Sequence, residues 1–452
     1  MDSPIIPAVY LAFHERAALG IILLTLLGLT SALILIAYLV PDASSSQNAP
    51  AGCRQLGSAS ASNFQRNLKF KRTSPSWVVE ALTIYPIKSC GPVVLPKADV
   101  VPTGLAYDRQ FSFAQLVSSL PAPQEDGSYK VDHQWQFATL RHFPRLARVN
   151  VELWVPDKRA KGYKSSEWVK SKGCIVVRFP FTPIVSFSID GLKAIWAGFQ
   201  AIVKERRISA EPEVSFYLPF DPCAERIEKM GYSREKMKIW KEAPEALNIS
   251  SEISPETLAK LKYFLGVRNP LTLFRVDTQK YRSVFRCAPR QDVTRYQPII
   301  GFQDAYALHM LNIASLEDLE SRISRRVIKH LDPLRFRFNI LISGPPAFAE
   351  DDWAVVRIGS CTYHVSCRTA RCKLPNVDPA TGIADKDEPH LAMAKYRRID
   401  EGAGLNPCLG MQLTPILTDD TVDAASNCKI GEIRVGDSVE LLRTGEHFYI
   451  KQ

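Results

Sequence analysis

The sequence predicts a mostly β fold with helices (class α+β), organised in two domains with appended segments and preceded by one transmembrane helix. The chain has 452 residues, which is more than one hydrophobic core usually holds. From Trp77 onward, short runs rich in Val, Ile, Phe and Tyr recur between turn residues, a pattern typical of β-strands. Residues 17–40, by contrast, form one uninterrupted apolar stretch without a charged side chain.

The apolar stretch at residues 17–40 is long enough to cross the hydrocarbon core of a bilayer. A cleaved signal peptide is the alternative, but the stretch is longer than the usual apolar core of such a peptide and little positive charge precedes it. In the tail at residues 1–16, Arg16 is the only Lys or Arg. By contrast, several Lys and Arg residues occur in the Ser- and Asn-rich linker at residues 41–76. Since the more positive flank stays in the cytosol, we expect the rest of the chain to face the cytosol.

The remaining chain divides into a β domain at residues 77–215, a helical connector at residues 216–297 and a second β domain at residues 298–452. Strands are predicted from their β-branched and aromatic content at residues 78–85, 110–116, 147–155, 174–181, 338–343, 353–358, 361–365 and 432–442. Helices are predicted at residues 192–206, within the charged segment 223–265, and at 311–330 with Ser315 as N-cap. The polar segments 120–133 and 157–172 are predicted hairpin insertions.

Composition restricts the partners of the chain. A net charge of +10 suits an anionic cofactor, an anionic membrane surface or an acidic protein. No basic run is interleaved with aromatic residues, so we do not expect nucleic acid as a partner. The 10 cysteines are scattered rather than paired as in small secreted proteins, which indicates reduced thiols.

Cys372 is the strongest candidate for chemistry. It follows Arg371 and precedes a turn-rich loop that contains Asp378. A neighbouring guanidinium favours the thiolate, which is the form that attacks carbon or binds a soft metal. A zinc site that Cys372 forms with Cys361, His364 and Cys367 is the alternative, but the spacing fits none of the usual zinc patterns.

Several basic and polar residues elsewhere are suited to an anionic ligand. Lys88 and Ser89 follow a predicted strand, where binding sites are often built, although a surface lysine at a turn is the simpler interpretation. Arg109 either binds such a ligand or forms an ion pair with Asp108. Arg337 and Asn339 are two residues apart and would share one face of a strand, together with Arg335.

Taken in this order, these motifs resemble those of the MOSC family of molybdenum-cofactor proteins, which carry an N-terminal MOSC-associated β domain before a MOSC β-barrel. The resemblance implies a molybdenum cofactor of the molybdopterin form, with Cys372 as the protein ligand to the metal and Asp378 near the substrate. It further implies cofactor contacts from Lys88, Ser89, Arg109, Thr139, Arg141, Tyr306, Arg337, Asn339, Thr369 and Arg371. This chain departs from the family pattern at Phe338, at Ala370 and after Asp304, where Tyr306-Ala307 follows.

The resemblance implies a membrane-anchored molybdenum oxidoreductase that reduces N-hydroxylated compounds such as amidoximes and hydroxylamines. Electrons would come from cytochrome b5 and its NADH-dependent reductase, and the absence of a G-x-G-x-x-G nucleotide loop agrees with an external donor. The implied location is the outer mitochondrial membrane, with the endoplasmic reticulum as the alternative. Two other functions stay open: a sulfur carrier of the sulfurase type, whose relatives bear a pyridoxal-phosphate domain that is not evident here, and a carrier of the cofactor without catalysis.

Overall fold

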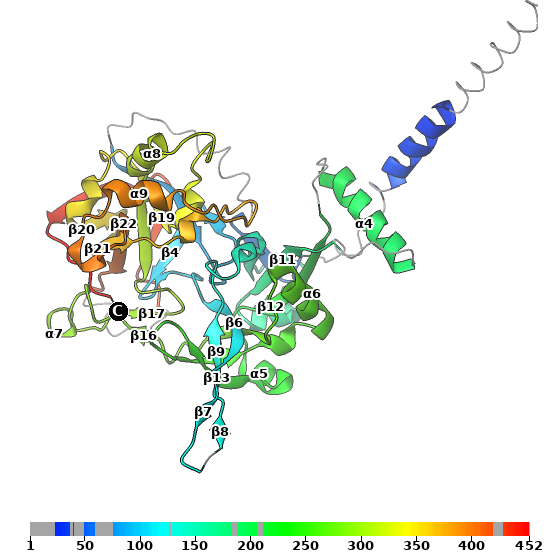
Figure 1. The fold of residues 1–452 in the computed structure, drawn as a ribbon, viewed down its shortest axis with the longest axis horizontal. Helices are drawn as coiled ribbons and strands as arrows, with labels where there is room; N and C mark the ends of the chain where they lie inside the picture. The colour runs from blue at the N-terminus through cyan, green and yellow to red at the C-terminus, as the bar shows by residue number, and fades with distance from the viewer. Residues whose placement is uncertain are drawn as a thin grey trace, which may run out of the picture. The chain divides into compact units, whose positions relative to one another are not determined.

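The computed structural model describes residues 23–36, 39, 49–58, 76–126, 128–182, 189–205, 211–418 and 428–451. The chain forms two compact units, of which the larger comprises residues 49–179 and 215–452 and the smaller comprises residues 1–48 and 180–214. The larger unit is mostly β, with short helices at its surface (Figure 1). The predicted class of a mostly β fold with helices is therefore confirmed.

The largest sheet of the structure has eight strands in the order β24-β20-β21-β22-β18-β19-β2-β3. These strands are β24 (Val439–Thr444), β20 (Trp353–Ile358), β21 (Cys361–Ala370), β22 (Cys408–Pro415), β18 (Leu308–Asn312), β19 (Ile340–Ser343), β2 (Val78–Ile84) and β3 (Val93–Leu95). β2 comes from the N-terminal part of the chain but pairs antiparallel with β19, with Leu82 opposite Ile340. Leu82 is fully buried, as expected in the interior of a sheet that is covered on both faces.

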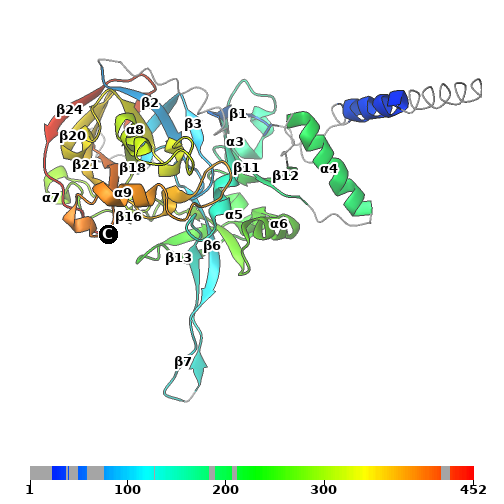
Figure 2. The same cartoon turned by 45° about the horizontal axis from the view of Figure 1, so that its top comes forward.

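A closed five-stranded barrel lies beside this sheet in the larger unit. Its strands are β13 (Ser233–Lys238), β14 (Glu245–Asn248), β15 (Leu271–Val276), β6 (Phe111–Ser118) and β9 (His133–Phe137). The barrel encloses buried apolar side chains that include Phe137, Met237 and Phe274. β7 (Ala122–Pro123) and β8 (Tyr129–Lys130) form a hairpin that projects from the barrel in both views (Figures 1 and 2), which confirms the hairpin predicted at residues 120–133.

Smaller sheets complete the β structure. They comprise β1 (Cys53–Leu56), β10 (Asn150–Pro156), β11 (Cys174–Pro180) and β12 (Glu213–Pro219); β23 (Gly431–Arg434), β4 (Lys97–Val101) and β5 (Gly104–Leu105); and β16 (Arg282–Ser283) with β17 (Ile299–Ile300). Among the described residues from 49 onward, the α-helices are α3 (Glu167–Lys170), α4 (Ile189–Glu205), α5 (Ala224–Met230), α6 (Pro255–Leu265), α7 (Gln291–Thr294), α8 (Ile313–Ser321) and α9 (His390–Tyr396). The smaller unit holds α4, which confirms the helix predicted at residues 192–206.

The predicted helical character of residues 216–297 is wrong in large part. This segment contains α5, α6 and α7, but it also supplies β13, β14 and β15 to the barrel. β13 has the sequence SREKMK and runs between β14 and β9, and Met237 is the one side chain of this strand that is fully buried. Pairing with two neighbours therefore overrides the helical preference of its charged residues.

Three other expectations are corrected. The helix predicted at residues 311–330 is the shorter α8, capped by the side chain of Asn312, while Ser315 is buried inside it and donates to Glu350 at 2.7 Å. Residues 157–172 contain α3 and a 3-10 turn instead of a hairpin. Residues 432–442 form two strands, β23 and β24, because Gly436 turns the chain with a positive φ of 93°.

The apolar stretch at residues 17–40 lies partly outside the described residues. Residues 23–36 of the stretch are helical. Among the residues that the structure describes, no helix has the length and apolar character needed to span a membrane.

Candidate functional site

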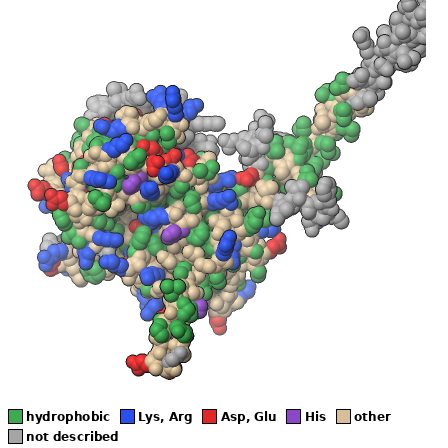
Figure 3. All heavy atoms as spheres, in the orientation of Figure 1, with side chains coloured by type: hydrophobic (Ala, Val, Ile, Leu, Met, Phe, Trp, Pro, Cys, Tyr) green, Lys and Arg blue, Asp and Glu red, His purple; other side chains and the backbone are tan. Residues whose placement is uncertain are grey.

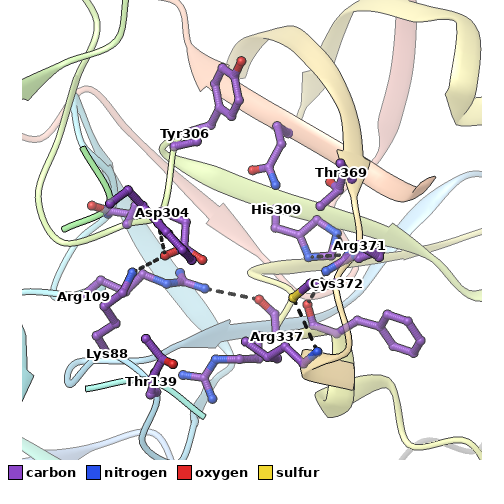
Figure 4. A pocket seen from close by; sticks show the side chains of 18 of the residues that line it. Lys88, Arg109, Thr139, Asp304, Tyr306, His309, Arg337, Thr369, Arg371 and Cys372 are labelled. Atoms are coloured by element: carbon purple, nitrogen blue, oxygen red, sulfur yellow. Dashed lines mark hydrogen bonds and ion pairs between the residues drawn. The ribbon is translucent and has the colours of Figure 1, made fainter. Parts of the chain in front are cut away.

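A cavity of about 530 Å³ opens in the larger unit where the barrel and the eight-stranded sheet meet. Of the residues predicted for the site, all but Asp378 line it: Lys88, Ser89, Arg109, Thr139, Arg141, Tyr306, Arg337, Asn339, Thr369, Arg371 and Cys372. They come from turns and strand ends that are far apart in the sequence, and Figure 4 shows most of their side chains around one space. The structure thus places these residues at one cavity, whereas their roles stay predictions.

Cys372 lies just beyond the end of β21, and its sulfur faces basic side chains. The Nε of Arg141 donates to the Sγ of Cys372 at 3.1 Å, and the backbone N–H of Leu374 approaches the same sulfur at 3.4 Å. Burial opposes the charge of Arg141, but Asp304 and Cys372 together raise its pKa. A sulfur that is held by a permanent cation is suited to carry negative charge, as nucleophiles and ligands of soft metals do.

Lys88 is buried in the wall of the cavity and holds Asp304 in place. Its Nζ donates to the Oδ1 of Asp304 at 2.5 Å and to the carbonyl oxygen of Phe302 at 2.7 Å. Burial lowers the pKa of Lys88 to about 8, although the Asp304 carboxylate works against this shift. Burial also acts to raise the pKa of Asp304, but Lys88 and Arg141 hold it below its usual value. Lys88 therefore sits close to its titration point at physiological pH.

Arg109, Asn339 and Arg337 form one connected group. Arg109 is paired with Asp108 and donates to the Oδ1 of Asn339 at 3.2 Å and to the carbonyl oxygen of Arg337 at 3.3 Å. The ion pair with Asp108, which the sequence left open, is thus present, and Arg109 still lines the cavity. Arg337 lies 3.9 Å from the ring centre of Tyr85, and burial lowers its pKa to about 10.

The expectation that Arg337 and Asn339 share a strand face is wrong. Arg337 ends the 3-10 helix η4 (Pro333–Phe336) in a left-handed conformation, and β19 begins only after Asn339. Arg335, which was expected on the same strand face, lies in η4 and does not line the cavity. It is buried and donates to the carbonyl oxygen of Asn376 at 3.1 Å and to the carboxylate of Asp378 at 2.5 Å. Arg337 thus lines the cavity, whereas Arg335 packs against the segment that contains Asn376 and Asp378.

Arg371 and His309 form a second buried pair at the cavity. The guanidinium of Arg371 donates to the carbonyl oxygen of Leu409 at 2.9 Å and to that of Phe336 at 3.2 Å, and it contacts the His309 ring. Burial and the charge of Arg371 lower the pKa of His309 well below its usual value. His309 is therefore neutral and accepts from Arg371. These contacts fix Arg371 next to Cys372 (Figure 4).

Backbone strain gathers around the cavity. Four of its lining residues have left-handed backbones although they are not glycine: Ser89 (φ 69°), Arg109 (φ 48°), Arg337 (φ 52°) and Trp240 (φ 56°). Such conformations are uncommon outside glycine, and they persist where surrounding structure enforces them, often at functional sites. The cavity is thus a built feature of the fold rather than a packing gap.

Two residues that line the cavity each carry a polar atom with no hydrogen-bond partner among the described residues. These atoms are the Nη2 of Arg337 and the Oγ1 of Thr369, and both are buried. Since buried polar groups are nearly always paired in folded proteins, such atoms indicate a ligand or water that completes them. The cavity therefore offers unused donors, several cations and one thiol, a set that suits a polar anionic ligand with a soft metal.

Two family models match the chain in the regions that build this cavity. Residues 297–440 match the MOSC domain, and residues 76–163 match the MOSC N-terminal beta barrel domain. The chain is a MOSC-domain protein. The matched regions include β2, β6, β18, β19 and β21, whose ends carry most residues of the cavity.

Curated proteins similar to this MOSC-domain chain have two kinds of names. Over 154 residues it is 38% identical to the mouse protein named mitochondrial amidoxime-reducing component 1, covering 33% of this chain and 41% of that protein. It is 34% identical over 144 residues to the rat mitochondrial amidoxime reducing component 2, covering 31% and 38%. It is 30% identical over 143 residues to the molybdenum cofactor sulfurase of rice, covering 29% and 17%. The matches thus span less than half of each relative.

Asp378 is the one predicted site residue that the structure places elsewhere. Its Oδ1 accepts from the backbone N–H groups of Ala380 and Thr381 at 2.9 and 3.1 Å, and its Oδ2 pairs with Arg335. These contacts stabilise the turn that begins at Asp378, as Asp side chains often do. The geometry thus gives Asp378 a role in the turn, and it does not support the expectation that this residue lies near the substrate.

Tyr306 lies at the margin of the cavity, and its ring extends away from Cys372 (Figure 4). Its hydroxyl donates to the carbonyl oxygen of Arg286 at 3.1 Å. Burial, followed by the nearby thiols of Cys367 and Cys287, raises its pKa, so it stays protonated. Tyr306 therefore shapes the wall without offering its hydroxyl to the centre.

Sequence reasoning missed several residues of this MOSC-domain cavity. His309, Trp240, Arg282 and Gln412 line it but belong to no motif that was singled out. His309 lies on β18 between two strands of the eight-stranded sheet, and Trp240 lies at the tip of the turn after β13. Asp304 also lines the cavity. Its position could have been suspected from the sequence, because it lies two residues before Tyr306 in a segment that resembles the family pattern.

Proposed function

We propose that this protein is a molybdenum-cofactor oxidoreductase that reduces N-hydroxylated substrates, such as amidoximes and hydroxylamines, with electrons from a cytochrome b5 chain. The observation that carries this proposal is the thiol of Cys372, which faces a cavity of basic residues and is held by Arg141 at 3.1 Å. The similarity to proteins named amidoxime-reducing components supports the choice of substrate class.

The residues of the cavity fit a molybdopterin-type cofactor. The cofactor is anionic through its phosphate, and Lys88, Arg109 and Arg337 present cationic groups to the same space. The unpartnered Nη2 of Arg337 and Oγ1 of Thr369 are available as polar contacts for the phosphate or the pterin. Cys372 offers a soft thiolate to the metal. When bound, the cofactor supplies two-electron redox chemistry at the metal.

The protein groups have separate tasks in this proposal. Arg141 keeps the sulfur of Cys372 oriented and compensates its charge, while Trp240 packs against Arg141 with 4.8 Å between guanidinium and ring centre. Lys88 forms an ion pair with Asp304, so one positive and one negative side chain have fixed positions at the cavity wall. Asp304, whose side chain is 48% exposed, stays a carboxylate because, against the effect of burial, Lys88 and Arg141 lower its pKa, so it can accept hydrogen bonds from water or from a bound substrate.

The electron donor is proposed to be a separate protein, because an acidic partner suits the charge of this chain. The net charge is +10, and Lys and Arg side chains are spread over the face seen in Figure 3. Such a surface attracts an acidic cytochrome at long range and speeds its association. Anchoring through residues 17–40 and an outer mitochondrial location are part of the same proposal, supported by the apolar composition of that stretch.

The test uses the full chain purified from a host that makes the cofactor. Molybdenum and pterin per chain are measured for the wild type, for Cys372→Ser and for Cys428→Ser, whose thiol is exposed outside the cavity. We expect one molybdenum and one pterin per wild-type chain and benzamidoxime turnover with NADH, cytochrome b5 reductase and cytochrome b5. Cys372→Ser should lower kcat by at least about 100-fold, as loss of a key catalytic group does, while Cys428→Ser should behave as wild type. A folded wild type without metal and pterin would refute the proposal.

A sulfur carrier is the second candidate, favoured by the similarity to the rice molybdenum cofactor sulfurase and by a thiol that is partly exposed. In that case Cys372 would carry a persulfide. Incubation with a cysteine desulfurase and cysteine, followed by peptide mass spectrometry, would show one added sulfur atom on Cys372. Persulfide on Cys372 without bound metal would favour this candidate over the oxidoreductase.

A further inference from the structure

Trp240 occupies a position where the backbone disfavours a large side chain. Ile239 and Glu242 exchange backbone hydrogen bonds of 2.8 and 3.0 Å, so Trp240 and Lys241 form a two-residue turn after β13. Trp240 is the first residue of this turn and has a positive φ of 56°. Glycine is favoured at such a position, and a bulky residue there is strained. Such a conformation persists only where surrounding contacts hold the residue in place, and it is often found at functional sites.

The indole of Trp240 is held by contacts on several sides. Its Nε1–H donates to the Oδ1 of Asp304 at 3.3 Å, and Phe137 packs edge-on with ring centres 5.1 Å apart. Glu242, which closes the turn, is paired with the buried Arg282. The ring orientation is therefore fixed relative to the cavity wall rather than left to rotate.

Part of the indole nevertheless remains open to the cavity. Trp240 is 43% exposed and lines the cavity. It lies next to Arg141, whose guanidinium is 4.8 Å from the ring centre and whose Nε contacts Cys372. A rigid aromatic surface thus stands one residue away from the thiol, where a flat molecule can stack on it.

We infer that Trp240 is a specificity-determining residue, on which planar conjugated N-hydroxylated substrates stack in preference to small aliphatic ones. This inference rests on the proposed function for the identity of the substrate head group. An amidoxime is planar and, when its carbon bears an aromatic ring, conjugated, so the ring would lie against the indole. The N–O group would then point past Arg141 toward Cys372.

The test compares two ligands that share the head group and differ in the ring: benzamidoxime and acetamidoxime. Their affinities for the purified holoprotein are measured by calorimetry without an electron donor. We expect Trp240→Ala to weaken benzamidoxime binding about three- to tenfold, the size of one aromatic contact. Acetamidoxime binding should change less than about twofold. Trp240→Phe should retain most of the preference, because it keeps a flat ring.

A fluorescence measurement separates stacking from a remote effect. Benzamidoxime should quench tryptophan fluorescence in the wild type but much less in Trp240→Phe, even where calorimetry shows that both bind. Trp240→Gly relaxes the turn and removes the ring, so it should match Trp240→Ala in ligand preference without a loss of Tm from backbone strain. Tyr129→Ala, which removes an exposed aromatic ring on the β7–β8 hairpin, is the control for ring removal in general.

The outcomes of this test are separable from those of the proposed function. Equal weakening of both amidoximes in Trp240→Ala would show that Trp240 only supports Arg141, and it would overturn the inference. Unchanged benzamidoxime affinity in Trp240→Ala, or no benzamidoxime binding to the wild type, would overturn it as well. Benzamidoxime that binds and stacks but is not reduced would instead count against the oxidoreductase proposal alone.

Discussion

Lys88 shows how the surroundings of one residue set its chemistry. It is a cation in the wall of a cavity that suits an anion. Burial nevertheless lowers the pKa of Lys88 to about 8, and the Asp304 carboxylate partly offsets that shift. As pH rises through this value, the side chain loses its proton and its positive charge. The charge available to an anionic ligand thus depends on pH in a range where ordinary lysines do not titrate.

We therefore expect retention of the cofactor to fall between pH 7 and pH 9. Loss of a charge-assisted hydrogen bond costs about 1.5–3 kcal/mol, which corresponds to about ten- to hundredfold in affinity. The measurement is molybdenum and pterin per chain after extended dialysis at each pH. Lys88→Arg keeps its charge at both pH values and should flatten the dependence. An equally steep decline in Lys88→Arg would assign the effect to another group.

At the residue scale, the sequence predicted which residues meet but not how they are held. The family resemblance pointed to Lys88, Arg141 and Cys372, and the structure places all three at one cavity. The contact of Arg371 with His309 and the stacking of Trp240 on Arg141 depend on pairings between distant strands and turns. No local sequence pattern encodes those pairings, so His309 and Trp240 were not predicted as residues of the site.

At the scale of elements, β13 shows where sequence patterns fail. Five of its six residues are charged or polar, and helix-forming residues predominate, so composition favoured a helix. Strand formation depends on β14 and β9, which are provided by other parts of the chain. By contrast, β20 and β6 are rich in β-branched and aromatic residues and were predicted within a few residues of their observed bounds.

The barrel assignment of β13 predicts a sharp contrast between two neighbouring substitutions. Met237 is fully buried and packs in the barrel core, whereas Lys238 is exposed. Met237→Ala should lower the free energy of unfolding by about 2–5 kcal/mol, the usual cost of a cavity in a core. Lys238→Ala should change it by less than about 0.5 kcal/mol. Chemical denaturation measures both, and equal effects would contradict the barrel position of Met237.

At the scale of the whole molecule, the two family-matched regions are joined by shared sheets. β2 and β3 of the N-terminal region extend the eight-stranded sheet beyond β19, and β4 pairs with β23. The linear division of the chain at residues 216–297 therefore does not correspond to a division between the sheets. The sequence alone showed the order of the two regions along the chain. It did not show that β2 pairs with β19 or β4 with β23, because these pairings join segments that are far apart in the sequence.

This sharing predicts that residues 298–452 do not fold when produced alone. Without β2, the edge of β19 and the apolar side chains beneath it are exposed, and an open edge of this kind favours aggregation. The expected result is an insoluble or uncooperative fragment, while residues 76–452 unfold in one cooperative transition. Circular dichroism during heating provides the comparison. A cooperative transition in the short fragment would show that the C-terminal region is independent.

The pairing of β2 with β19 also constrains synthesis. Asn339 donates to the carbonyl oxygen of Thr83 across a separation of 256 residues. At ribosomal rates of about 5–20 residues per second, β2 waits on the order of tens of seconds for its partner strand. During that interval an apolar strand with unpaired backbone groups is available to chaperones and to neighbouring nascent chains. Yield in the cell is thus governed by what protects β2 on the ribosome, in addition to the stability of the finished protein.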